Sequence, residues 1–372
     1  MRKLIIFCLL ALSVMTSNVE AVEMPDNSLG FASHGSGTVG GQNGTQMFIE
    51  TAHDFRDAVR GDLPATIYIN SKIDLTDLFV SSPGVIVDVG SNKSIIGISS
   101  ESEITGGGLR IRGQEQVIIR NLKLTNALSF DEGEYPDGNG GIQTNLQSRL
   151  NPGDFTEIDA ITIENSQHVW VDHNYFSDEP WIAADVPIGS NRHDGLIDIK
   201  RGSNWVTISN NIFTNHNKTI LVGHSDSNAA QDLDKLKVTF AYNWFKGTEQ
   251  RNPRVRFGEV HVLNNLYTDI SSYGIGVGVS AQVIAEENVF INTNRAWGHP
   301  DGPPSSMGYL LNKNNLLINS SYDQEQAGKY QEVPSYGINW IPKNYYELPS
   351  IPVDEVESYV RINAGPYAEH SE

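Results

Sequence analysis

The segment VTISNNIF at residues 206–213 defines a pattern that recurs along the chain. The pattern begins with an apolar residue, has Asn five positions later and an aromatic residue seven positions later. The other clear copies are VWVDHNYF (169–176), VTFAYNWF (238–245), VHVLNNLY (260–267) and VIAEENVF (283–290). Fainter copies place Asn121 of QVIIRNLK and Asn315 of LLNKNNLL at the position of the repeated Asn. The last three clear copies start 22 and 23 residues apart, so the longer intervals elsewhere indicate inserted loops.

A period of this length, made of short strands and turns, is typical of a parallel β-helix. Each coil stacks on the previous one and buries the surface that it could not bury alone. We therefore predict an all-β, right-handed parallel β-helix with long inserted loops. The repeated Asn side chains should form a hydrogen-bonded ladder, and the aromatic side chains should lie in the interior. Both sets are expected to be structural and not catalytic.

Few other elements are expected. Residues 52–60 should form a short helix with Thr51 as its N-cap. From Ala65 onward, Val, Ile and Thr alternate with Asn, Gly and Asp, which predicts strands and no second long helix. The Pro-rich tail after about Pro304 should form irregular loops. Because solenoids grow by adding coils, we expect residues 22–372 to form a single catalytic domain.

Residues 1–21, MRKLIIFCLLALSVMTSNVEA, have the basic start, apolar run and small final residues of a secretory signal peptide. An uncleaved membrane anchor is the alternative. The only cysteine, Cys8, lies in this segment, so the mature protein would have no thiol or disulfide. No later run is apolar and long enough to cross a membrane. We expect a secreted monomer, either extracellular or periplasmic, with no membrane partner.

The chain is strongly acidic, with 45 Asp and Glu against 26 Lys and Arg and a net charge of -19. Removal of the signal peptide would make the charge -20, because Arg2, Lys3 and Glu20 would be lost. Such a surface repels nucleic acid, so no nucleic-acid partner is expected. It would also repel an anionic polymer unless positive charge were concentrated at the binding site.

Two kinds of charged residue stand out against this background. Asp194 and Asp198 lie four residues apart before a strand, so their side chains should point the same way and could bind a hard cation such as calcium. A solvated strand edge is the alternative reading. Asp159, Asp198 and Arg251 precede their repeats by similar distances, and Lys218 and Arg251 fall near matching points of successive repeats. A strip of acids followed by bases is therefore expected; the basic residues are Lys218, Arg251, Arg254 and Arg256. A network of ion pairs would give the same spacing.

The blocks that carry these residues resemble those of pectate lyases of polysaccharide lyase family 1. They are DAITI (159–163), VWVDHN (169–174), HDGLIDIKRGSNWVTISNN (193–211), NHNKTILVGHSD (215–226) and RNPRVRFGEVHVLNNLY (251–267). Weaker similarity reaches upstream through VGSNKSIIG (89–97) and VIIRNLKLTN (117–126). The resemblance implies a secreted enzyme that cleaves polygalacturonate by β-elimination with calcium.

The resemblance also implies a role for individual residues. Asp159, Asp194 and Asp198 would be calcium ligands, and Glu157 stands where some members have another acidic ligand. Lys218 and Arg256 would bind substrate carboxylates with support from Arg254, and Arg251 would abstract the proton. Asp172 and His173 match a block whose role is expected to be structural.

Three other functions compete with this reading. A pectin lyase acts on methyl-esterified polymer without calcium, and its neutral substrate has less need of the three aspartates. A galacturonan hydrolase requires two carboxyl groups but no arginine cluster. A non-catalytic polysaccharide-binding β-helix would not require Lys218 and Arg251, although a fold alone does not establish function.

Overall fold

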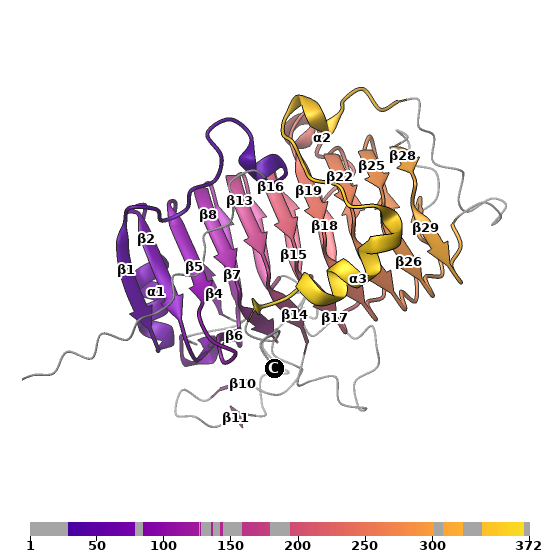
Figure 1. The fold of residues 1–372 in the computed structure, drawn as a ribbon. Helices are drawn as coiled ribbons and strands as arrows, with labels where there is room; N and C mark the ends of the chain where they lie inside the picture. The colour runs from indigo at the N-terminus through magenta and orange to yellow at the C-terminus, as the bar shows by residue number, and fades with distance from the viewer. Residues whose placement is uncertain are drawn as a thin grey trace, which may run out of the picture.

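The computed structural model describes residues 29–78, 85–125, 127, 135–136, 142–143, 158–178, 194–300, 308–322 and 337–367. Within these residues the chain winds into coils, and equivalent strands of successive coils stack into three parallel sheets (Figure 1). The predicted parallel β-helix is confirmed. The predicted signal peptide lies outside the described residues.

The largest sheet, called here the ten-strand sheet, receives one strand from each coil. Its strands are β1 (Thr45–Ile49), β2 (Ala65–Ile69), β5 (Lys93–Gly97), β8 (Glu115–Arg120), β13 (Gln167–Asp172), β16 (Asn204–Ser209), β19 (Val238–Ala241), β22 (Glu259–Leu263), β25 (Gln282–Glu286) and β28 (Tyr309–Lys313). Its register places Val169, Val206, Val238, Val260 and Val283 side by side, which confirms the alignment of the five clear repeats.

The nine-strand sheet contains the aromatic end of each repeat. Its strands are β3 (Lys72–Asp74), β6 (Glu103–Thr105), β9 (Lys123–Thr125), β14 (Tyr175–Ser177), β17 (Ile212–Thr214), β20 (Trp244–Lys246), β23 (Leu266–Thr268), β26 (Val289–Ile291) and β29 (Leu316–Ile318).

The eight-strand sheet completes each coil and carries most of the candidate site. Its strands are β4 (Ile86–Asp88), β7 (Gly108–Arg112), β12 (Ile161–Glu164), β15 (Ile197–Lys200), β18 (Ile220–Val222), β21 (Arg254–Val255), β24 (Ile275–Val277) and β27 (Trp297–Gly298). A separate antiparallel pair is formed by β10 (Tyr135–Pro136) and β11 (Ile142–Gln143).

The predicted asparagine ladder runs along the turn between the ten-strand and nine-strand sheets. Each Asn Nδ2 donates to the Oδ1 of the next Asn at 2.8 to 3.1 Å, from Asn174 through Asn211, Asn243, Asn265 and Asn288 to Asn315. The residue before each of these has a left-handed backbone, with φ between 50° and 59°. That conformation turns the chain sharply and directs the Asn side chain into the stack, where its polar groups are satisfied.

One repeat was assigned in the wrong register. Val117 pairs with Val169, so Asn121 lies one position before the ladder and Leu122 occupies the ladder position. The backbone N–H of Leu122 donates to Asn174 Oδ1 at 3.1 Å and ends the ladder. Asn121 instead donates to the carbonyl of Gly97 at 2.6 Å. Asn315 does lie in the ladder, as predicted.

The aromatic residues of the repeats stack in the interior, as predicted. Phe176, Phe213, Phe245, Tyr267 and Phe290 form a continuous row with centroid separations of 4.3 to 5.0 Å. All five are fully buried, together with the Val and Ile residues that face inward from the three sheets.

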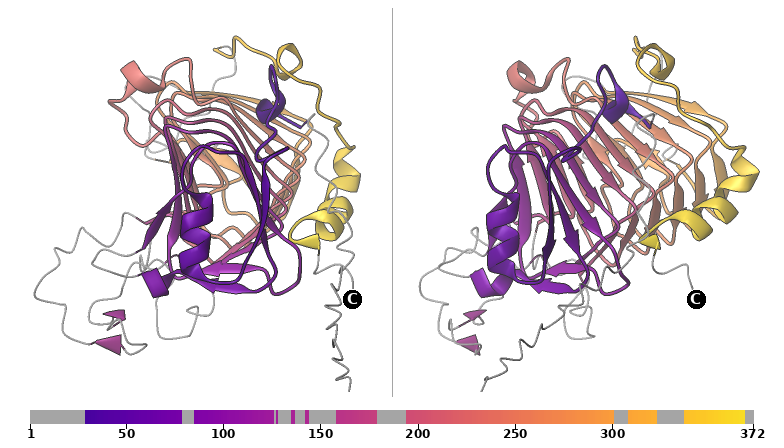
Figure 2. Two further views of the ribbon diagram at one scale, coloured as in Figure 1. Left: turned by 90° about the vertical axis from the view of Figure 1, so that its left-hand side faces the viewer. Right: turned by 60° about the vertical axis from the view of Figure 1, so that its left-hand side comes forward.

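The short helix α1 (Ala52–Val59) lies across the N-terminal end of the coils (Figure 2). Thr51 is its N-cap and accepts a hydrogen bond from the N–H of Asp54 at 3.1 Å, as predicted. Ala52, Phe55 and Val59 of this helix are buried in the core. The helix therefore shields the end of the core, which has no further coil to cover it.

The expectation that no second long helix follows and that the tail forms irregular loops is wrong. The tail contributes β28 and β29 and ends in α3 (Val353–Asn363), which packs across β23 and β26 of the nine-strand sheet (Figure 1). Val356, Val360 and Ala364 are buried against that sheet. The shorter elements are α2 (Ala229–Asp232), η1 (Phe31–Ser33), η2 (Leu75–Leu78) and η4 (Pro342–Asn344). None of the helices in the described part of the chain has the length and hydropathy required to span a membrane.

Candidate active site

The eight-strand sheet brings together charged residues that are far apart in the sequence. Asp159 precedes β12, Asp194 precedes β15, and Asp198 lies within β15. Because β12 and β15 pair in parallel, with Ile161 opposite Ile197, these residues meet at one region of the sheet.

The three aspartates form a compact acidic triad. One carboxylate oxygen from each of Asp159, Asp194 and Asp198 lies within 4.8 Å of the others. Asp159 and Asp198 are buried, with 2% and 4% of their surface exposed, whereas Asp194 is partly exposed. The backbone N–H of Gly195 and the hydroxyl of Thr162 donate to Asp159 at 3.0 and 2.7 Å and fix its carboxylate. Three of the four expected calcium ligands, Asp159, Asp194 and Asp198, thus lie together, with Asp159 on the neighbouring coil.

The ionised forms of Asp159 and Asp198 are unfavourable within the triad. Burial raises the pKa of Asp159 well above its usual value, and the negative charge of Asp198 raises it further. Burial also raises the pKa of Asp198, partly opposed by Lys200 and reinforced by Asp194. Carboxylate oxygens are the ligands that calcium prefers, and a divalent ion would offset both the burial of these charges and their mutual repulsion. The donor set therefore fits calcium.

Lys200 is a member of the site that the sequence reasoning missed. Its Nζ lies 3.0 Å from Asp198 Oδ2 and 3.6 Å from Asp159 Oδ2. Burial alone would lower the pKa of Lys200, but the two carboxylates raise it above its usual value. A signal was available, because residues two apart on a strand face the same side and Lys200 follows Asp198 at that distance.

The basic residues continue the site toward the C-terminal coils. Lys218 precedes β18, and its Nζ lies 2.9 Å from Asp194 Oδ1. Arg254 begins β21, which pairs with β18, and Arg251 and Arg256 flank that short strand. The expected change from acids to bases along this sheet is therefore present. The alternative of a plain ion-pair network is also partly realised, because Lys218 and Asp194 are paired.

Arg251 does not occupy quite the position that the repeat suggested. Lys218 pairs with Gln250, so Arg251 lies one residue beyond the matching point. Its backbone is left-handed, with φ of 61°, and its carbonyl accepts a hydrogen bond from Ile220 N at 2.7 Å. Its Nε is buried and has no hydrogen-bond partner among the described residues. Left-handed non-glycine residues recur at the turns between strands of this structure, so the backbone of Arg251 is that of a coil turn.

The two other arginines have different surroundings. Burial, with help from the charges of Arg256 and Arg251, lowers the pKa of Arg254 to about 10. Arg256 donates from Nε to Asp226, a residue of the β18–β19 connection, and from Nη1 to the carbonyl of Gly223 at 2.9 Å. The crowding of three guanidinium groups therefore favours an anionic partner at this end of the sheet.

Three other residues belong to the sequence prediction. Glu157 lies outside the described residues. Asp172 ends β13 in the ten-strand sheet and His173 follows it, away from the eight-strand sheet that carries the triad. Asp172 contacts His173 at 2.7 Å and accepts hydrogen bonds from Ser209 at 2.6 Å and Asn210 at 3.1 Å. These contacts link buried side chains of neighbouring coils, as a structural role requires.

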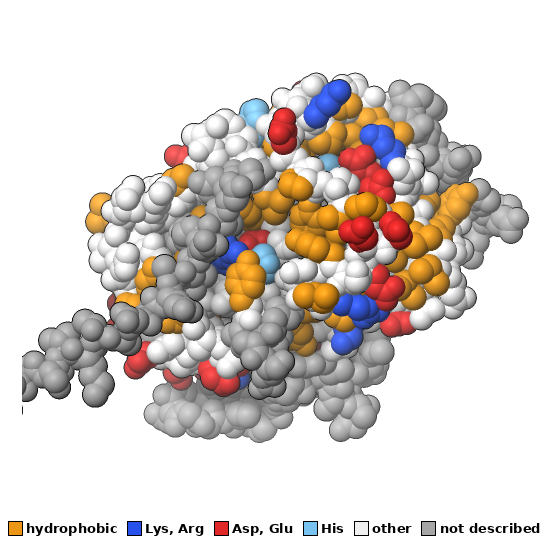
Figure 3. Space-filling view, in the orientation of Figure 1, with side chains coloured by type: hydrophobic (Ala, Val, Ile, Leu, Met, Phe, Trp, Pro, Cys, Tyr) orange, Lys and Arg blue, Asp and Glu red, His pale blue; other side chains and the backbone are white. Residues whose placement is uncertain are grey.

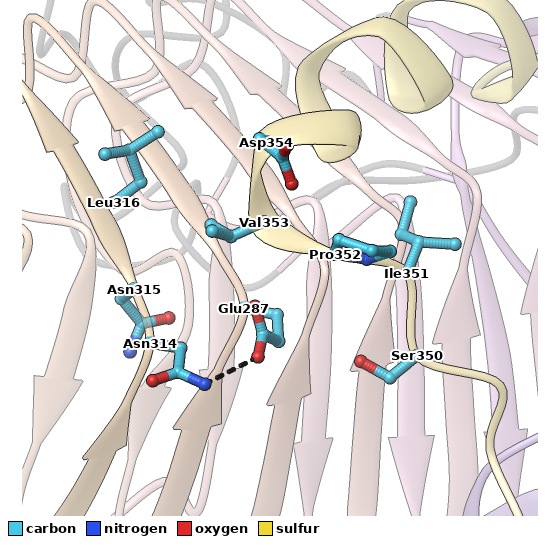
Figure 4. Close-up of a pocket in the computed structure, with 9 residues that line it drawn as sticks. All are labelled: Glu287, Asn314, Asn315, Leu316, Ser350, Ile351, Pro352, Val353 and Asp354. Carbon is cyan, nitrogen blue, oxygen red and sulfur yellow. Dashed lines mark hydrogen bonds between the residues drawn. The ribbon is translucent and has the colours of Figure 1, made fainter.

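The charged residues of the candidate site are separate from the pocket beside the start of α3. A pocket of about 620 Å³ lies beside the start of α3 (Figure 4). It is lined by Glu287, Asn314, Asn315, Leu316 and residues 350–354, with Asn314 donating to Glu287 at 2.9 Å. No member of the triad or the basic cluster lines it. On the face that carries α3, the acidic and basic side chains are scattered between apolar ones (Figure 3).

Comparisons with known proteins agree with the fold and show the family of the chain. The family described as Pectate lyase matches residues 2–366. The chain is 35% identical over 290 residues to pectate lyase A of Emericella nidulans, covering 78% of this chain and 75% of that protein. It is 34% identical over 352 residues to pectate lyase D of Dickeya chrysanthemi, covering 86% of each. A solved pectate lyase of Bacillus sp. N165 in complex with trigalacturonate superposes with a TM-score of 0.70 at 28% identity, covering 92% of this chain and 98% of that one.

Proposed function

This chain belongs to the pectate lyase family, and we propose that it cleaves α-1,4-linked polygalacturonate, the de-esterified form of pectin, by calcium-assisted β-elimination. The family assignment makes it a polysaccharide lyase. The observation that carries the finer proposal is the acidic triad, compact to within 4.8 Å, beside a group of basic side chains on one sheet. The trigalacturonate bound to the Bacillus relative supports the substrate class.

The reaction needs positive charge next to a substrate carboxylate. The hydrogen on C5 of a galacturonate unit is alpha to that carboxylate, and its removal pushes negative charge into the carboxylate group. Asp159, Asp194 and Asp198 would hold calcium, with Glu157 as a further ligand. When bound, calcium supplies positive charge that stabilises the carbanion-like transition state. Lys218, Arg254 and Arg256 would bind and orient the carboxylates of the polymer.

Arg251 would act as the base in its neutral form. It takes the proton from C5, the C–H electrons form the C4–C5 double bond, and the C4–O bond to the neighbouring sugar breaks. The leaving oxygen gains a proton, which gives a new reducing end and a 4,5-unsaturated sugar on the other fragment. A guanidinium is normally protonated, so the reaction should be favoured at alkaline pH. The pKa of about 10 at Arg254 supports a site that penalises guanidinium charge.

The remaining proposals rest on the sequence alone. Residues 1–21 would direct secretion, to the extracellular medium or the periplasm. The net charge of -19 makes nucleic acid an improbable partner, and the enzyme is proposed to act as a monomer on soluble polymer.

The test is the ultraviolet absorbance of the new conjugated double bond when the mature protein meets polygalacturonate at alkaline pH. Absorbance should rise with calcium, stop when chelator is added and resume when calcium is restored. New reducing ends without absorbance would instead identify a hydrolase. Cleavage confined to methyl-esterified pectin and insensitive to chelator would identify a pectin lyase. No cleavage of any pectic polymer would leave a binding protein.

A further inference from the structure

His216 contacts both ends of the connection that leads from β14 to β15. Asp178 directly follows β14, and Asp194 precedes β15. His216 lies on the next coil, in the segment between β17 and β18. Its Nδ1 is 3.0 and 2.9 Å from the two carboxylate oxygens of Asp178, and its Nε2 is 3.0 Å from the carbonyl oxygen of Asp194.

The chemistry of these contacts fixes the imidazole ring. A carboxylate and a carbonyl oxygen are both acceptors, and each ring nitrogen of His216 faces one of them. Only 5% of the His216 side chain is exposed. A buried ring held at both nitrogens has little freedom to rotate, and its position is therefore determined by both partners.

The contact reaches the acidic triad through the backbone of Asp194. The N–H of Asp194 donates to the carbonyl of Ile158 at 2.9 Å, while its own carbonyl accepts from His216. With both backbone groups held, the partly exposed side chain of Asp194 is directed toward Asp159, Asp198 and Lys218.

We infer that His216 is a positioning residue that holds Asp194 in the geometry needed to bind a divalent cation. The inference rests on the proposed function only in that the triad must bind calcium. Residues that orient metal ligands typically contribute 10- to 100-fold to metal affinity. Loss of both His216 hydrogen bonds should therefore weaken calcium binding by about 10-fold or more, with little change in turnover once calcium is saturating.

The test is calorimetric titration of the full mature protein with calcium alone, without substrate. His216→Phe keeps the ring volume and removes both donors. The matched control is His261→Phe, because His261 is equally buried and has both nitrogens bonded, to Tyr346 and Glu286, on the ten-strand sheet. Both variants should lose thermal stability. Only His216→Phe should bind calcium at least 10-fold more weakly and need more calcium for half-maximal activity.

The outcomes separate this inference from the proposed function. Wild-type calcium affinity in a folded His216→Phe variant would overturn the positioning role and leave the calcium-dependent lyase intact. Absence of calcium binding in the wild-type protein would overturn both. If His216→Phe does not fold, Asp178→Asn decides, because it weakens one anchor of the same ring. Reduced calcium affinity in that variant supports the role, and unchanged affinity overturns it.

Discussion

The ammonium nitrogen of Lys218 lies 2.9 Å from a carboxylate oxygen of Asp194 and so joins the acidic triad to the basic cluster. Both side chains are partly exposed, which leaves them able to exchange partners. Calcium at the triad would compete with Lys218 for Asp194 and release the lysine for a substrate carboxylate. Metal binding and substrate binding should therefore be coupled at this residue pair.

The first prediction concerns the metal ligands. Asp198→Ala should lower activity at limiting calcium, because the triad loses one of its two buried carboxylates. Excess calcium should restore part of the activity, with the half-maximal calcium concentration raised about 10-fold or more. Asp88→Ala on the same sheet is the control, since Asp88 is exposed and pairs with Arg110. An unchanged calcium requirement in Asp198→Ala would remove Asp198 from the proposed ligands.

The second prediction concerns the base. Arg251→Lys should lower kcat about 100-fold or more with little effect on KM, because loss of a positioned base mainly affects the chemical step. Initial rates across a range of polygalacturonate concentrations, with calcium saturating, measure both constants. Arg110→Lys is the matched control, because Arg110 lies on the same sheet but forms an ion pair with Asp88. Full turnover in Arg251→Lys would show that another group takes the proton, as would a rate optimum in acid.

The third prediction concerns pH and the free triad. A carboxyl whose pKa is raised by folding binds its proton more tightly in the folded state, so stability falls as pH rises above about 4. In chelator, Asp159→Asn should therefore lose less thermal stability than wild type between pH 4 and 8. With calcium present, Asp159→Asn should lose as much thermal stability as wild type over this pH range, or more. Parallel Tm curves for the two proteins in chelator would contradict the proposed charge repulsion.

The fourth prediction separates stability from substrate binding. The lowered pKa of Arg254 means that folding disfavours its charge, a penalty that is full below about pH 10 and is lost as pH rises from there toward the unfolded pKa. Arg254→Gln should therefore be at least as stable as wild type at pH 8. Its KM for polygalacturonate should nevertheless rise about 10-fold, because a charged hydrogen bond to the substrate is lost. Arg112→Gln, which removes a pair with Glu164, should leave KM unchanged.

The fifth prediction tests the asparagine ladder. Asn243 is fully buried, and its side chain exchanges hydrogen bonds with Asn211, Asn265 and the carbonyl of Ile208. Asn243→Ala should lower the free energy of unfolding by about 3 kcal/mol, because several buried groups lose their partners. Asn315→Ala, at the partly exposed end of the ladder, should cost about 1 kcal/mol. Urea unfolding measures both, and equal losses would show that the ladder does not act as a buried network.

Two predictions were wrong, the register of the repeat around Asn121 and the absence of a second long helix. The repeat around Asn121 has no Asn at the true ladder position, so only the pairing of Val117 with Val169 reveals that Leu122 belongs there. Helix α3 did leave a signal, since Val356, Val360 and Ala364 recur at helical spacing. The many prolines before it obscured that signal, and the sheet against which the helix packs is not apparent from the tail itself.

The sequence by itself determined the coil architecture, because strand alternation, the repeated Asn and the repeated aromatic residue are local patterns with one consistent phase. It also predicted that Asp194 and Asp198 lie on the same side, and their carboxylates do meet, although Asp194 lies at a bend before β15 and not in the strand. Only the tertiary structure decided that Asp159 joins them within 4.8 Å, that Lys200 also approaches Asp159 and that His216 contacts Asp194. These contacts cross between coils separated by loops of unequal length. The hydrogen-bonded register of neighbouring strands, and not the count of residues between them, sets which side chains meet.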